Sequence, residues 1–115
     1  MDAPQTLHGG AERQRLRWRV DGEGRPDHLA WYRIAAGGLC TAHRHTGKAE
    51  TWLIVAGTGR VEIDADAFDV EPGDVFVTRP GQSHALRNTG TDALIFVNIV
   101  RFTGGPVTTT ELAGP

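Results

Sequence analysis

The chain has 115 residues, enough for one domain with its own hydrophobic core and too few for a second catalytic domain. Its formal net charge of -2 and its pI near 6.2 leave no excess of positive charge for binding phosphates, which excludes nucleic acid as an expected partner and favours a small organic ligand. The single cysteine, Cys40, cannot form an internal disulfide, and the sequence shows neither a leader pattern nor a membrane-spanning apolar stretch, so we expect a soluble cytoplasmic protein without a membrane partner.

Short apolar stretches separated by glycine and proline predict an all-β domain. We expect polar tails at residues 1–12 and 103–115 and a folded barrel domain at 13–102. The first predicted strand runs from Arg15 to Val20, where Leu16, Trp18 and Val20 alternate with arginines. The later strands are predicted at 29–35, 39–45, 50–56, 60–63, 67–70, 75–78, 84–88 and 93–102. Such a series of short strands is typical of a sandwich or a barrel.

A cluster of potential metal ligands begins in the predicted strand 39–45. His43 and His45 are two residues apart, so in a strand both side chains project from the same face. Glu50 opens the next strand and can reach across to them, and His84 follows a Pro80-Gly81 turn that can return it to the same space. Imidazoles with one carboxylate suit a divalent transition metal such as Zn, Mn, Fe, Ni or Co.

The spacing of these residues resembles the two motifs of the cupin superfamily. The stretch from Gly37 to Gly57 matches the first motif at every fixed position, and the second motif is matched by Gly73, Gly81, His84 and Asn88. One departure is Pro80, which stands one residue later than the proline of the motif. The resemblance implies a double-stranded β-helix, the cupin jelly-roll β-barrel, and it implies one metal ion held by His43, His45, Glu50 and His84.

Four further residues are candidates for the wall of a substrate pocket. Trp52 and Ile54 share the parity of Glu50 and are expected to face the same cavity, although a core-packing role suits them equally. Tyr32 or Arg33, whichever faces inward, offers a proton donor or an anion clamp. Cys40 has the opposite parity to His43 and is expected to be a buried, inert thiol.

Two other groups of residues are given no functional role by the sequence. His8 and His28 lie outside both motifs, and an isolated histidine is usually a surface or a core residue. The run Arg13, Arg15, Arg17 and Arg19 could bind an anionic substrate, but a solvated strand face is the simpler interpretation.

Similarity to cupins implies several functions, which stay open at this point. The leading hypothesis is a metal-dependent enzyme of bacterial metabolism, including biosynthesis, that polarises an oxygen-bearing small molecule for isomerisation, cyclisation or elimination. In this hypothesis Glu50 becomes a general acid or base if it dissociates from the metal. The alternatives are an iron-dependent dioxygenase and a module that binds a small ligand without turnover. We also expect a homodimer, with Leu16, Trp18 and Val20 as an apolar stripe at its interface.

Overall fold

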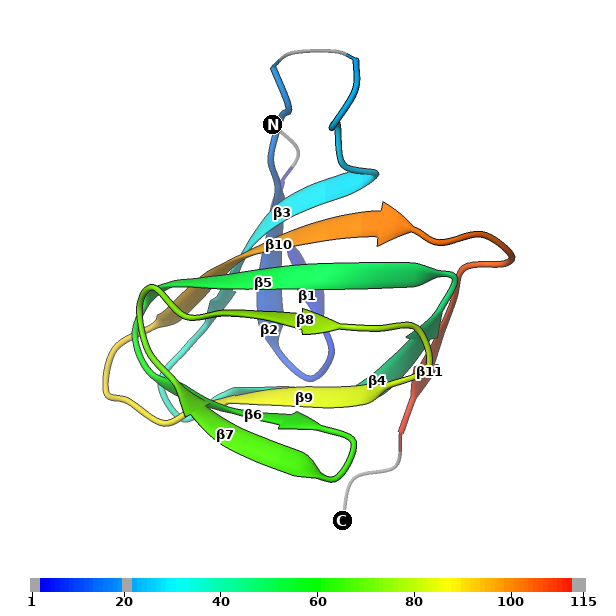
Figure 1. The fold of residues 1–115 in the computed structure, drawn as a ribbon. Coiled ribbons are helices and arrows are strands. Elements are labelled where there is room, and N and C mark those ends of the chain that lie inside the picture. Colours follow the sequence, from blue (N-terminus) through cyan, green and yellow to red (C-terminus); the bar gives the residue numbers. More distant parts are fainter. Residues whose placement is uncertain (1–2, 20–21, 113–115) are drawn as a thin grey trace.

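The computed structural model describes residues 3–19 and 22–112, which form two antiparallel sheets that face each other (Figure 1). One sheet has the strand order β1-β2-β3-β10-β5-β8, and the other has the order β11-β4-β9-β6-β7. The strands are β1 (Gln5–Leu7), β2 (Ala11–Arg15), β3 (His28–Ile34), β4 (Leu39–Thr46), β5 (Lys48–Ala56), β6 (Gly59–Ile63), β7 (Asp66–Val70), β8 (Val75–Thr78), β9 (Ser83–Asn88), β10 (Leu94–Phe102) and β11 (Thr108–Glu111). The predicted all-β double-stranded β-helix is confirmed. The described part of the chain has no helix with the length and apolar character needed to cross a bilayer.

The core lies between the two sheets and follows the two-residue period of the strands. In β10, Leu94, Phe96, Asn98 and Val100 are buried, and the residues between them are only partly buried. The same alternation occurs in β6 and β9. His43 is one of the largest fully buried side chains, so the histidines occupy the same interior as the apolar core.

Two residues of the predicted motifs hold turns at one end of the barrel. Gly57 has a φ of +82°, and a Cβ atom there would lie 2.5 Å from the carbonyl oxygen of Ala93, so only glycine fits. The buried amide of Asn88 donates to the carbonyl oxygens of Ile34, at 2.9 Å, and Asp92, at 2.8 Å. The structural role that the cupin resemblance implies for Asn88 is confirmed.

The predicted first strand, Arg15 to Val20, is wrong. The strand in this region is β2, which ends at Arg15, although the Leu16 amide still donates to the Leu29 carbonyl at 2.9 Å. Trp18 is exposed, and Val20 lies outside the described residues. The strand lies nearer the N-terminus than predicted because β2 pairs with β1 through the His8-Gly9-Gly10 turn. The alternation of Leu16 and Trp18 carries no information about that pairing.

The segments predicted as tails also contain strands. β1 and the start of β2 fall within residues 1–12, and β11 falls within residues 103–115. β11 pairs with β4, where Thr109 lies opposite His45 and Glu111 lies opposite His43. All four residues of β11 are exposed, so this edge strand needs no apolar period and gives no signal in the sequence.

Candidate metal centre

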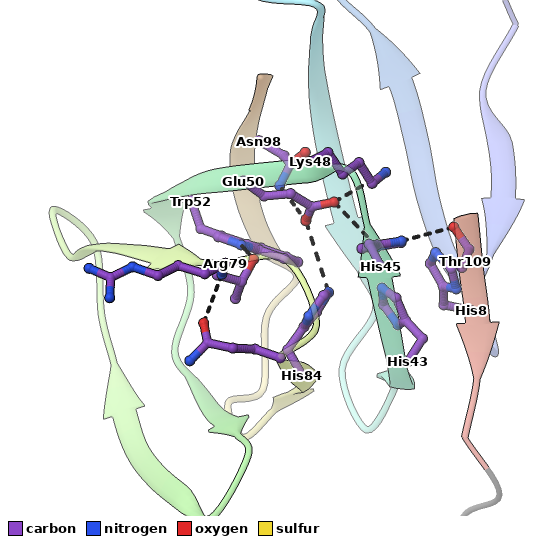
Figure 2. A network of polar contacts seen from close by, with 12 residues as sticks. His8, His43, His45, Lys48, Glu50, Trp52, Arg79, His84, Asn98 and Thr109 are labelled. Carbon is purple, nitrogen blue, oxygen red and sulfur yellow. Dashed lines mark hydrogen bonds and ion pairs between the residues drawn. The ribbon is translucent and has the colours of Figure 1, made fainter. Parts of the chain in front are cut away.

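The two sheets bring the predicted ligands to one place in the barrel interior (Figure 2). β4 and β9 are neighbours, and their register puts His43 directly opposite His84. His45 follows on the same face of β4, and only Gly47 separates β4 from β5. Because the chain crosses to the other sheet at Gly47, Glu50 faces the histidines from across the barrel.

The three imidazoles are buried and close together. One nitrogen from each of His43, His45 and His84 lies within 4.8 Å of the other two. Glu50 is also buried, with Oε1 3.3 Å from His45 Nε2 and Oε2 3.9 Å from His84 Nε2. The three histidines therefore form one cluster, and Glu50 lies beside His45 and His84.

Hydrogen bonds orient two of the rings and leave the third unsatisfied. His43 Nδ1 donates to the Thr41 carbonyl at 2.7 Å, and His45 Nδ1 contacts Thr109 Oγ1 at 2.8 Å, so each ring keeps Nε2 available. His84 Nε2 is buried and makes no hydrogen bond within the described residues. A buried polar atom without a partner costs about 1 to 3 kcal/mol. A bound metal ion would supply the missing partner for His84.

Burial keeps the three histidines in the form that binds metals. It lowers the pKa of His43, and it lowers the pKa values of His45 and His84 to about 3. The charge of Lys48 adds to the effect on the pKa of His45. Near neutral pH the three rings are therefore uncharged, and a neutral imidazole offers a nitrogen lone pair to a metal. The donor set fits a divalent transition metal.

Both carboxylate oxygens of Glu50 have additional partners. Lys48 Nζ lies 3.4 Å from Oε1, and Asn98 Nδ2 donates to Oε2 at 3.2 Å. Asn98 is not singled out by the sequence analysis. One feature of the sequence points to Asn98, because its amide lies between the inward-facing apolar residues Phe96 and Val100 of a strand. A buried amide at such a position normally has a hydrogen-bond partner in the interior.

A cavity of 190 Å³ adjoins the cluster and has His43, His45 and Glu50 in its wall. Of the predicted pocket residues, Trp52 and Tyr32 line it. The Trp52 indole also donates to Thr78 Oγ1 at 3.0 Å, so it serves the core as well as the cavity.

The other two pocket candidates lie elsewhere. Ile54 packs in the hydrophobic core rather than in the cavity wall. Arg33 follows Tyr32 in β3 and therefore points to the outer face of the sheet. The choice between Tyr32 and Arg33 is thus decided in favour of Tyr32.

Cys40 also lines this cavity, against the parity expected from the sequence. The register of β4 and β9 shifts between Cys40 and His43, and this irregularity puts both side chains on the inner face. Burial raises the pKa of Cys40 to about 12, in agreement with an inert thiol.

His8, which the sequence analysis set aside, is part of the site. Its ring stacks on His43 with centroids 3.8 Å apart, and its Nδ1 lies 2.5 Å from Glu111 Oε1. The ligand atoms of His8, His43 and Glu111 also lie within 4.8 Å of one another. No motif contains His8 or Glu111. The turn after β1 brings His8 to the site, where its carbonyl accepts a hydrogen bond from the Thr41 amide, and the pairing of β11 with β4 brings Glu111.

The arginine run divides into two pairs. Arg13 and Arg15 are partly buried and line cavities beside Glu50, whereas Arg17 and Arg19 are exposed. The interpretation as a solvated face is wrong for the first pair, because both side chains lie in β2 and line cavities whose walls include the buried Glu50.

Comparisons with known proteins agree with this architecture. The sequence profile of the cupin domain matches residues 30–100. A crystal structure described as a predicted oxalate decarboxylase from Thermotoga maritima superposes with a TM-score of 0.74 over 86% of this chain and 91% of the other, at 24% identity. At that identity the likeness shows the fold alone.

Two curated proteins are similar in sequence. An oxalate-binding protein from Thermotoga maritima is 29% identical over 72 residues, which cover 63% of this chain and 60% of the other. A 5-nitrosalicylic acid 1,2-dioxygenase from Bradyrhizobium is 35% identical over 65 residues, which cover 56% of this chain and 31% of the other. The chain thus spans less than two thirds of either relative.

Proposed function

The chain belongs to the cupin-domain family, and on this premise we propose that it is a metal-dependent enzyme acting on an oxygen-bearing small molecule. The ligands that we assign to one divalent transition metal are His43, His45, Glu50 and His84. The observation that carries the proposal is the cluster of three buried imidazoles, two of them 3.3 Å and 3.9 Å from the Glu50 carboxylate, with His84 Nε2 left without a hydrogen bond in the described structure. A metal ion accounts for this arrangement better than an apolar core does.

The chemistry supported by this set is isomerisation, cyclisation or elimination. A divalent ion supplies the positive charge that polarises an oxygen atom of the ligand. Glu50 lies in the cavity wall and, when its carboxylate is not bound to the metal, acts as the general acid or base. Trp52 and Tyr32 line the same cavity and provide aromatic surface beside the reacting group.

Two other functions are supported by one relative each. A dioxygenase is favoured if the metal is iron, because open positions on iron accept substrate and oxygen together, and one relative is a dioxygenase. A binding module without turnover is favoured by the relative named an oxalate-binding protein.

The test of the proposal is metal content by mass spectrometry on untagged protein. We expect about one transition-metal ion per chain, retained in His28→Ala and lost in His84→Ala. His28 is the matched control, because it is a partly buried histidine outside the cluster. Iron would direct activity assays to oxygen uptake, and zinc, manganese, nickel or cobalt would direct them to isomerase, cyclase and lyase reactions. A chain that takes up no metal after reconstitution contradicts the proposal.

We also propose that a second copy of the chain covers the outer face of the six-stranded sheet. The register aligns Trp31, Val97, Leu53 and Val75 in one row across four strands, and the last two are 38% and 59% exposed. Such an apolar row on an outer face is typical of an interface. This face replaces the stripe at Leu16, Trp18 and Val20, since the strand that would form the stripe is absent from the described structure.

Light scattering tests the dimer. We expect a mass of twice 12.4 kDa for the wild type and of one chain for Leu53→Glu. A single-chain mass for the wild type contradicts it. The cytoplasmic location and the lack of nucleic-acid and membrane partners stay predictions from the sequence.

A further inference from the structure

Two adjoining cavities beside the metal centre have cationic walls. The 190 Å³ cavity shares Arg13, Tyr32, Lys48 and Glu50 with a neighbouring cavity of 90 Å³. The second cavity also reaches Arg15, His28 and Asn98. Apart from the histidines, the charged side chains in the two walls are Arg13, Arg15, Lys48 and Glu50, so three cations face one carboxylate.

The cations have hydrogen-bond donors that the protein does not use. Arg13 donates from one terminal nitrogen to Gln5, yet its buried Nε makes no hydrogen bond in the described part of the chain. Lys48 has three N–H donors and contacts a single oxygen of Glu50 in its ion pair. Arg15 contacts His28, so it is less available than the other two. A buried, unused donor beside a cavity favours an anionic acceptor from a ligand.

The shape of the space indicates how such a ligand would lie. His43 and His45 line one part of the larger cavity, and Arg13 and Lys48 lie where the two cavities join. A volume of 190 Å³ is below the roughly 300 Å³ at which pockets for drug-sized molecules begin, so the ligand is small. A small molecule with two polar ends can reach the imidazoles with one end and the cations with the other.

We propose that Arg13 and Lys48 bind an anionic group of the ligand, of the carboxylate class, at the junction of the two cavities. Tyr32 lies in the same wall, and its phenol is a further donor to that group. The inference rests on the proposed function, because it takes the other end of the ligand to lie at the metal centre. It identifies the substrate class as small organic acids with a second oxygen-bearing group.

The test compares charged and uncharged forms of the same small probe. Malonate, succinate and glutarate are each titrated by calorimetry beside their monoamides, which keep the size and lose one charge. The proteins are the wild type, Arg13→Gln, Lys48→Gln and the control Arg17→Gln, whose arginine is exposed. Each titration is done with metal-loaded and with EDTA-treated protein at low ionic strength, where charge effects are strongest.

In the wild type, we expect at least one dicarboxylate to bind about tenfold more tightly than its monoamide. Arg13→Gln and Lys48→Gln reduce that preference to near one, whereas Arg17→Gln keeps it. Circular dichroism checks that each variant is folded, and if Arg13→Gln is unfolded, Lys48→Gln decides the result.

Three results would overturn the inference. They are wild-type protein that binds none of the dicarboxylates, equal affinity within every pair, and a full preference in both cavity variants. Metal content separates this inference from the proposed function. If the protein takes up no metal but still prefers a dicarboxylate to its monoamide, and if that preference depends on Arg13, the anion site is supported and the metal centre is contradicted. If the protein takes up metal but shows no such preference, the metal centre is supported and the anion site is contradicted.

Discussion

The part of the chain matched by the cupin profile, residues 30–100, and the terminal strands outside it contribute differently to the site. The matched part supplies every assigned metal ligand from β4, β5 and β9. The turn after β1 and the terminal strands β2 and β11 supply residues that surround those ligands, namely His8, Arg13 and Thr109. The difference indicates that the assigned metal ligands come from the family core, whereas the wall of the cavity beside them is built from both regions.

The largest expected effect is on stability, when a glycine in each of the two regions is replaced by alanine. Gly57→Ala introduces a Cβ 2.5 Å from the Ala93 oxygen at a φ of +82°, so we expect a loss of about 3 kcal/mol or more in the free energy of unfolding. Gly105→Ala, in the connection to β11, has a similar φ of +77° with no atom within 4 Å, and its expected loss is about 1 kcal/mol. Urea unfolding measures both values.

Equal losses for the two glycine variants would contradict this difference. They would mean that backbone strain alone determines the cost and that the close approach of Gly57 to Ala93 is unimportant.

A smaller effect is expected from the contact between β11 and the metal centre. Thr109→Val removes the hydrogen bond to His45 Nδ1 and keeps the side-chain shape. Loss of such a partner lowers metal affinity by about 10- to 100-fold. The control is Thr110→Val, since Thr110 lies opposite the exposed Arg44 rather than opposite a ligand. Competition with a chelator measures the affinities, and an unchanged affinity in Thr109→Val would confine the metal centre to the family core.

The smallest effect concerns the reactivity of Cys40 in the family core. With a pKa of about 12, about one thiol in ten thousand is ionised at pH 8, so we expect alkylation by iodoacetamide to be negligible in the folded protein. In urea the reaction proceeds at the rate of an ordinary cysteine. Mass spectrometry follows the modification, and rapid alkylation of the folded chain would show that the terminal strands do not cover the cavity that Cys40 lines.

The sequence predicted the fold and the convergence of the ligands because both depend on local patterns. The spacing of His43, His45 and Glu50 follows from one strand and the start of the next, and His84 is joined to them by a register that the cupin resemblance implies. The loop before β9 is fixed by the Gly81 amide, which donates to the His45 carbonyl at 2.7 Å. Although Pro80 stands one residue later than the proline of the cupin motif, His84 therefore still lies opposite His43.

The surroundings of the site could not be predicted because they depend on pairings distant in sequence. His8 and Glu111 are 103 residues apart, and neither belongs to a periodic apolar segment. Cys40 was given the wrong face because parity fails across an irregularity in β4, and such an irregularity is not visible in a single sequence. Arg13 was predicted to lie on a solvated strand face next to the N-terminal tail, because the turn between β1 and β2 was not recognised in the sequence.

Anomalous diffraction from a crystal of the metal-loaded protein would locate the ion and its ligands. We predict one peak per chain, bounded by nitrogen atoms of His43, His45 and His84 and by an oxygen of Glu50, at about 2.0 to 2.2 Å from each. A peak bounded instead by His8, His43 and Glu111 would contradict the assignment and transfer the metal centre to the terminal strands.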